Sequence, residues 1–197
     1  MMDALGIHIS NIKASIKAET DPVELRTFAD SQSLSFTHKP ITNSFFLFKL
    51  QINGHTVVIT IYYKGHINVT GLKTEQELSY IIHNVLVNIP GIRNILSKQI
   101  DNLTATSRLK IGSLYGGKLN FKAIISYLQR DAQVKTVKYV SQKFPGAFIK
   151  FHSGGTITLF PSGKFNILGC HTEKHIYHLY ITFNKLIEEI AEEIQDH

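Results

Sequence analysis

The chain has 197 residues, 43% of them hydrophobic and 18% charged, which is typical of a globular protein that can bury a core. Its single cysteine, Cys170, excludes a disulfide framework and predicts a reducing intracellular compartment, and we expect neither a secretory signal nor a membrane span. The net charge is +6, but five of the 15 acids lie between Glu188 and Asp196. The rest of the chain has 10 acidic and 21 basic residues. This balance of +11 favours a polyanionic partner, although many basic proteins bind no nucleic acid.

The first half of the chain predicts a strand, a helix, several strands and a second helix. Period-two alternation predicts the first strand, and Asp21-Pro22 reads as an N-cap followed by proline at the first helical position. Asn53-Gly54 and Lys64-Gly65 read as turns between strands, and a capping residue at Thr74 opens a helix that Pro90-Gly91 ends. The predicted strands are 7–17, 33–37, 45–52, 56–62 and 66–70, and the predicted helices are 22–30 and 74–89.

The second half repeats this order, and the repeat is the main result of the sequence. It predicts a strand over 99–111, a turn at Gly116-Gly117 and a helix over 118–130. A strand over 134–140, three strands within 144–170 and a helix over 172–194 follow. The landmarks that pair between the halves are Asn11 with Asn102, Lys49 with Lys150, Gly65 with Gly163, and Gly71 with Gly169. We therefore predict one repeat over 1–97 and a second over 98–197.

Two copies of this order predict an α+β fold in which each half has helices on one sheet face only. Right-handed twist curves an antiparallel sheet of this kind. Two such halves joined at their edges would form a pseudo-symmetric curved sheet, with helices on its convex face and an open concave face. We expect the function to lie on that concave face.

The sequences FPGAFIKF (144–151) and TLFPSGKFNILG (158–169) resemble the second repeat of the TATA-box-binding protein family. IYYKGHINVTGLKTEQE (61–77) resembles the matching part of its first repeat, and SNIKASI and DNLTATS match the strands that begin the repeats. The resemblance implies a saddle whose underside grips the DNA minor groove. It also implies aromatic wedges that unstack base steps and bend the duplex by about 80°.

The resemblance assigns the wedges most clearly in the second repeat. Phe144 and Phe160 match the pair of rings that enters one base step. In the first repeat, Tyr62 matches one wedge and Asn43 falls on the other, although Phe45 could serve if its strand slips. The alternative for each ring is an ordinary core residue on a strand.

The resemblance also implies polar and cationic contacts to DNA. Phosphate contacts give affinity and salt dependence without sequence information, whereas the minor groove presents only acceptors at A·T pairs and adds the guanine amino donor at G·C pairs. Because Asn and Thr replace apolar groove-floor residues of the family, we expect an altered or relaxed sequence preference. The predicted groove contacts are Asn11, Asn102, Thr60, Asn68, Thr70, Thr104, Thr158, Asn166 and Leu168. The predicted phosphate contacts are Lys13, Lys49, His66, Lys150 and Lys164.

The surface before the second FPG departs from the family. Family members carry an acidic stretch there that transcription factor IIB contacts, whereas this chain has Val140, Gln142 and Lys143. A divergent factor IIB-like protein or RNA polymerase subunits are therefore the expected partners of a monomer bound to promoter DNA. A factor encoded by a large DNA virus with its own polymerase would fit, which leaves the nucleus, a cytoplasmic virus factory or the virion as expected locations.

Nothing in the sequence predicts catalysis, a cofactor or a metal. Cys170, His171, His175 and His178 lack the second cysteine or carboxylates that a metal site needs, and a solvated helix face is favoured. No nucleophile has a base and an orienting acid, so we expect a protein that is not an enzyme. The alternatives are a protein-interaction module that uses the concave face for a protein partner, and a recognition domain of a nuclease or glycosylase.

Overall fold

The computed structural model describes residues 3–32, 36–37, 45–109 and 120–195, and it divides the chain into two compact units. Unit 2 comprises 11–102, and unit 1 comprises 1–10 together with 103–197. Two long strands, β1 (His8–Thr20) and β6 (Ile92–Arg108), each contribute to both units. The strands of the described residues are hydrogen-bonded in the order β2-β3-β4-β5-β1-β6-β10-β9-β8-β7.

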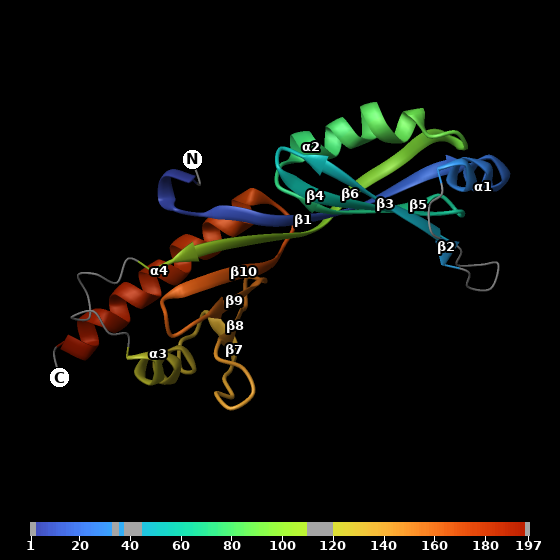
Figure 1. Ribbon diagram of the computed structural model, residues 1–197. Helices are drawn as coiled ribbons and strands as arrows, with labels where there is room; N and C mark the ends of the chain where they lie inside the picture. The colour runs from blue at the N-terminus through green and yellow to red at the C-terminus, as the bar shows by residue number, and fades with distance from the viewer. Residues whose placement is uncertain (1–2, 33–35, 38–44, 110–119, 196–197) are drawn as a thin grey trace. The chain divides into compact units, whose positions relative to one another are not determined.

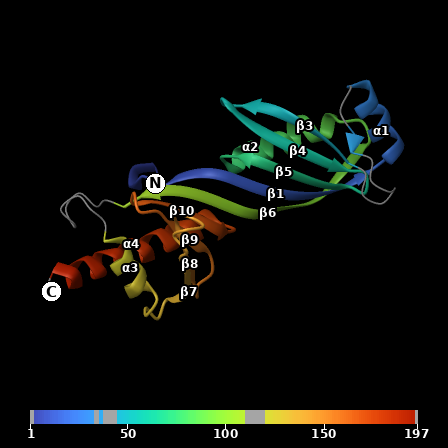
Figure 2. The same ribbon diagram turned by 60° about the horizontal axis from the view of Figure 1, so that its bottom comes forward.

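Unit 2 is an antiparallel sheet, and Figure 2 shows β3, β4, β5, β1 and β6 side by side in that order. Asp21 caps the first helix by accepting hydrogen bonds from the backbone N–H groups of Val23 and Glu24. The turn between β3 and β4 is tight because Asn53 and Gly54 both adopt positive φ, at 48° and 80°. The elements within unit 2 are α1 (Pro22–Ser31), β2 (Phe36–Thr37), β3 (Phe45–Ile52), β4 (His55–Tyr62), β5 (His66–Leu72) and α2 (Glu75–Tyr80).

Unit 1 repeats this arrangement with one long helix. Its sheet pairs β6 with β10, β10 with β9, β9 with β8 and β8 with β7, all antiparallel. Figure 1 shows α4 lying along β10, and α3 lies beside α4 and β7. The elements are α3 (Phe121–Leu128), β7 (Val134–Lys138), β8 (Ala147–Phe151), β9 (Thr156–Leu159), β10 (Lys164–Cys170) and α4 (Glu173–Gln195). No helix of the described ranges combines the length and apolar character needed to cross a membrane.

Each sheet has one face buried against helices and one open face. In unit 2 the buried face carries Ile16, Ile59 and Ile67, each at most 1% exposed. In unit 1 the matching residues are Ile157 and Phe165, both fully buried. The residues between them point the other way, because successive side chains of a strand alternate between faces. We call the surfaces they form the open faces of the two units.

The predicted elements are present, and two of them differ clearly from their predicted bounds or geometry. β6 begins at Ile92, seven residues before the predicted strand, directly after Pro90-Gly91. The helix that follows Thr74 keeps α geometry only to Tyr80 and continues as a π turn over 81–85 and a 3-10 turn over 86–88. The two compact units divide after Asn102, and residues 1–10 belong to unit 1. The predicted boundary at 97/98 describes the repeat in the sequence and stays a prediction. The predicted turn at Gly116-Gly117 and strand residues 33–35 and 110–111 lie outside the described residues.

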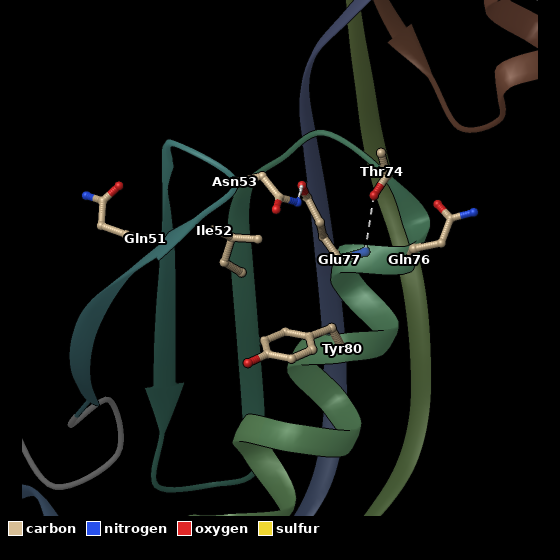
Figure 3. Close-up of a pocket in the computed structure, with 7 residues that line it drawn as sticks. All are labelled: Gln51, Ile52, Asn53, Thr74, Gln76, Glu77 and Tyr80. Carbon is tan, nitrogen blue, oxygen red and sulfur yellow. Dashed lines mark hydrogen bonds between the residues drawn. The ribbon is translucent and has the colours of Figure 1, made fainter.

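A buried carboxylate joins the β3–β4 turn to α2. The Glu77 side chain is 7% exposed and accepts hydrogen bonds from the Lys73 backbone N–H at 2.7 Å and the Asn53 amide at 3.3 Å, and it lies 3.3 Å from His55 Nε2. Glu77 and Asn53 line an open pocket of about 410 Å³ together with Thr74 and Tyr80 (Figure 3). Burial would raise the pKa of Glu77, but these donors and the His55 charge together hold that pKa below its ordinary value of 4.5.

Substituting Glu77→Gln is expected to lower the free energy of unfolding at neutral pH by about 1–2 kcal/mol, because hydrogen bonds to a charged group are lost. Since folding lowers the pKa of Glu77, its contribution is complete above the ordinary value and is lost as pH falls through the folded value. The difference between wild type and variant should therefore shrink below about pH 4.5 in chemical denaturation. An equal difference at neutral and acidic pH would contradict this role.

Candidate nucleic-acid interface

Three phenylalanine rings gather on the open face of unit 1. Phe144 precedes β8, Phe148 lies within it, and Phe160 follows β9. The Phe144 ring centroid lies 5.0 Å from that of Phe148, with the rings stacked, and 5.7 Å from that of Phe160, edge to face. Phe144 is 37% exposed and Phe148 41%, although residues of this size are usually buried. We call these three residues the ring cluster.

Gly146 makes room for the ring cluster. A Cβ atom at this position would lie 2.7 Å from Cε1 of Phe144 and 3.1 Å from Cε1 of Phe160. Both distances are shorter than carbon atoms tolerate without movement. The glycine of the FPG sequence therefore lets the two predicted wedges meet across neighbouring strands.

The ring cluster covers Thr158, which the sequence predicted as a groove contact. Thr158 is only 2% exposed, and it pairs across the sheet with Phe148 on one side and Asn166 on the other. Its hydroxyl is buried and has no hydrogen-bond partner among the described residues. In this arrangement Thr158 is too buried to be accessible to a ligand, and Phe148, which the prediction did not consider, lies directly opposite it on β8.

Unit 2 carries a different aromatic pair at the matching place. Phe45 and Tyr62 are directly opposite each other on β3 and β4, with ring centroids 5.2 Å apart and tilted by 45°. Phe45 therefore lies beside Tyr62 in the observed β3–β4 register, without a shift of β3. It occupies the position of Gly146, by the spacing that relates Lys49 to Lys150. Asn43, the other predicted wedge position, lies outside the described residues.

Leu47 is the counterpart of Phe148 by the same spacing, and it is 39% exposed. Both residues lie opposite a threonine of the next strand, Leu47 opposite Thr60 and Phe148 opposite Thr158. The sequence analysis missed these two apolar side chains. Their alternation with Lys49 and Lys150 was the signal that would have placed them on the open faces.

Asn11 has a structural contact that fixes its orientation. Its side-chain oxygen accepts a hydrogen bond from the Gly71 backbone N–H at 2.8 Å, beside the irregularity in the β1–β5 register after Ile12. The amide oxygen is therefore engaged within the protein, and the NH₂ group is the end of the side chain that is left to donate. A donor suits the acceptors that the minor groove presents at every base pair.

The remaining predicted groove residues lie on the open faces. In unit 2, Thr60 is paired with Asn68, and Thr70 lies further along β5. In unit 1, Asn166 is paired with Thr106 of β6, and Leu168 with Thr156 of β9. All are half-buried, as are Asn102 and Thr104 of β6. Apart from Thr158, the structure thus leaves each predicted groove residue partly accessible.

The cationic positions are exposed. Lys13 lies on β1, Lys49 on β3, His66 on β5, Lys150 on β8 and Lys164 on β10. Lys164 pairs with Arg108 of β6, which is also exposed and which the sequence analysis did not select. Each unit therefore presents cations around the aromatic and polar residues of its own open face.

The cysteine and histidines at the start of α4 lie elsewhere. Cys170 is buried, and burial raises its thiol pKa to about 11, so the thiol stays protonated at neutral pH. His171 and His178 are exposed. The described residues contain no group of three or more side chains placed to hold a metal ion.

The repeated antiparallel sheet, with helices on one face and rings, amides and cations on the other, defines a two-repeat α+β protein with an open sheet surface. The family described as "Transcription factor TFIID (or TATA-binding protein, TBP)" matches residues 6–90 and 113–190. The chain belongs to this TBP family, and the TBP-like fold predicted from the sequence is confirmed.

A similar solved structure is that of Methanococcus jannaschii TBP, with a TM-score of 0.69 and 23% sequence identity over 93% of this chain and 98% of that one. A search of curated proteins found no match.

Proposed function

We propose that the chain is a non-catalytic transcription initiation factor that docks its open sheet faces in the minor groove of promoter DNA and bends the duplex. The family description names a transcription factor and a TATA-binding protein. The observation that carries the proposal is the ring cluster of unit 1, in which Phe144 and Phe160 are in edge-to-face contact at an open face. Apolar wedges of this kind unstack a base step and kink DNA toward the major groove.

The charge of the open faces supports the same proposal. Lys150 and Lys164 flank the ring cluster on β8 and β10, and Lys49 occupies the corresponding place in unit 2. Cations placed beside a groove-binding surface neutralise phosphates and release condensed counterions. They position the protein on the duplex, whereas Asn11, Asn68 and Asn166 supply the amide groups that can contact base edges.

Unit 1 is proposed to be the stronger of the two wedge sites. It carries three rings, of which Phe144 contacts both Phe148 and Phe160, whereas unit 2 carries Phe45 and Tyr62 beside the smaller Leu47. We also propose an altered or relaxed sequence preference, because amides and hydroxyls replace apolar groove-floor residues of the family.

The proposed protein partner is a divergent factor IIB-like protein or a polymerase subunit. Val140 is 54% exposed in the segment before Phe144, and Gln142 and Lys143 are exposed beside it. A partner for this surface would make an apolar contact with Val140 and would not depend on acidic residues in this segment. Because the segment adjoins the ring cluster, the partner would contact the protein next to bent DNA.

The proposal is tested with the whole chain and short labelled duplexes. Binding should weaken steeply as salt rises, since phosphate contacts release counterions. Energy transfer between dyes on the two duplex ends should increase on binding, because bending brings the ends together. Failure to bind any duplex at low salt would overturn the proposal, and binding without a change in energy transfer would overturn the bending mechanism.

The alternative is a protein-interaction module that uses the open face for a protein. The exposed, clustered rings favour it as well, because aromatic residues dominate protein–protein hot spots. The same duplex experiment separates the two functions, since a protein-binding face gives neither salt-dependent duplex binding nor bending.

A further inference from the structure

A carboxylate lies on the open face of unit 2, among its predicted DNA contacts. Asp101 of β6 accepts a hydrogen bond from the Ser15 hydroxyl of β1 at 2.5 Å, and the Lys13 ammonium lies 3.8 Å from the same carboxylate oxygen. The Ser15 hydroxyl is also 3.4 Å from the side-chain oxygen of Asn68 on β5. We call these four residues the Asp101 cluster.

The Asp101 cluster leaves an acceptor open to solvent. The Asp101 side chain is 25% exposed, and both of its contacts within the described residues are made to Oδ2. An ionised carboxylate offers about four lone-pair sites on two oxygens. A hydroxyl has one proton, and the shorter contact takes it, so Ser15 holds Asp101 in place and Oδ1 remains able to accept from a ligand.

An outward-facing carboxylate discriminates between base pairs in the minor groove. A·T and T·A pairs present only acceptors there, and a carboxylate beside an acceptor is repelled. A G·C pair adds the guanine N2 amino group, which donates. A charged acceptor makes a stronger hydrogen bond to such a donor than a neutral one does. Lys13 offsets the repulsion between Asp101 and the phosphates by contributing an opposite charge at 3.8 Å.

We propose that Asp101 is a specificity-determining residue that accepts a hydrogen bond from the N2 amino group of a guanine in the minor groove, held for this by Ser15. The inference rests on the proposed function, because it requires the open face of unit 2 to bind duplex DNA. It assigns to this chain a preference for a G·C pair where the duplex meets β1 and β6 of unit 2. Such a preference is opposite to that of a surface that reads only A·T acceptors.

Two simpler roles for Asp101 make different predictions. If the carboxylate only joined β1 to β6, its removal would change stability and leave base preference unaltered. If it only repelled the phosphates, its removal would strengthen binding to every duplex by the same factor. Only a hydrogen bond to the amino group makes binding depend on that one substituent of guanine.

The test uses the full chain and duplexes in which inosine replaces guanine one position at a time, because inosine lacks only the N2 amino group. We expect one position at which the replacement weakens binding of the wild type about fivefold or more, within the range seen for loss of one base contact. Asp101→Ala should bring the ratio at that position close to one. Glu173→Ala, which removes an exposed acid from α4, should keep the wild-type ratio.

The inosine comparison on the wild type needs no variant and therefore does not depend on whether Asp101→Ala folds. Asp101→Asn, which retains the side-chain shape, is a second variant, and it should bind duplexes of A·T pairs more tightly than the wild type does. If the protein binds duplexes but no inosine replacement weakens binding, or if Asp101→Ala keeps the ratio, the inference is wrong and the proposed function stands. If no duplex binds, both are wrong.

Discussion

Replacing Phe144 and Phe160 together with Ala is expected to weaken duplex binding at least about thirtyfold, since stacking on a base contributes about 1–3 kcal/mol per ring. The increase in energy transfer that reports bending should be lost in the same variant, because the two rings act on one base step. Fluorescence anisotropy at fixed salt measures the affinity. Phe144 is exposed and Phe160 is half-buried, so the free energy of unfolding should change less than the affinity.

Two controls make this result specific. Tyr177→Ala removes a similarly exposed aromatic side chain, 39% against 37% for Phe144, from α4 rather than from an open face, and should leave binding unchanged. Replacing Phe45 and Tyr62 with Ala should weaken binding to a smaller extent, because unit 2 lacks a third ring. Unchanged binding and bending in the Phe144 and Phe160 variant would remove the main support for the proposed function.

The second large effect is expected at Gly65, where the chain turns from β4 into β5. Gly65 has φ +81°, and a Cβ atom there would lie 2.0 Å from the Ala18 carbonyl oxygen, which belongs to the backbone of β1 and cannot move away alone. The Gly65 carbonyl also accepts a hydrogen bond from the Ala18 N–H at 2.8 Å. Gly65→Ala should therefore lower the free energy of unfolding by about 3 kcal/mol or more, from backbone strain and displacement of β1.

Gly54→Ala is the matched control for Gly65→Ala. Gly54 has nearly the same φ, +80°, but a Cβ atom there has no neighbour within 4 Å. Only the conformational cost of a left-handed residue remains, about 1–2 kcal/mol. Chemical denaturation of the two variants measures the difference, and equal losses would show that contact with β1 contributes nothing.

Most of the fold could be predicted because the same hydrophobic pattern occurs in both halves of the chain. Residues such as Ile59 and Ile157 alternate with polar residues, and the turns at Gly65 and Gly163 recur at the same place in each half. Alternation of period two determines which side chains face the helices, and together with the turn signals it predicted the strands. Phe144 and Phe160 were placed side by side by the resemblance, which matches them to the pair of rings that enters one base step.

The first residues of β6 could not be predicted, because they are not held by burial. The segment from Arg93 to Gln99 is mostly exposed and has no alternation. It is attached to its neighbours by polar contacts instead: Arg93 lies 2.9 Å from Asp21, and the Asn94 amide donates to Glu19 at 2.6 Å. Contacts of this kind join residues more than 70 positions apart and leave no periodic signal.

Parts of the candidate site could also not be predicted from the sequence. The resemblance placed Thr158 and Asn102 by position, but burial of Thr158 depends on how the Phe148 ring lies across a neighbouring strand. Asp101 gave no signal because its proposed role requires the β1–β6 pairing, which brings Ser15 next to it. The pairing of Phe45 with Tyr62 likewise depends on the register of β3 and β4.

The buried Thr158 hydroxyl has an energetic consequence for the proposed docking. An unpaired buried hydroxyl costs a folded protein about 1–3 kcal/mol, and in the free protein the Thr158 hydroxyl has no partner among the described residues. If the ring cluster docks on DNA as proposed, movement of Phe144 and Phe148 toward a base step would uncover Thr158 and give its hydroxyl access to water or to a base edge. That access would remove the cost of the unpaired hydroxyl, so the proposed docking would couple ring movement to hydroxyl exposure.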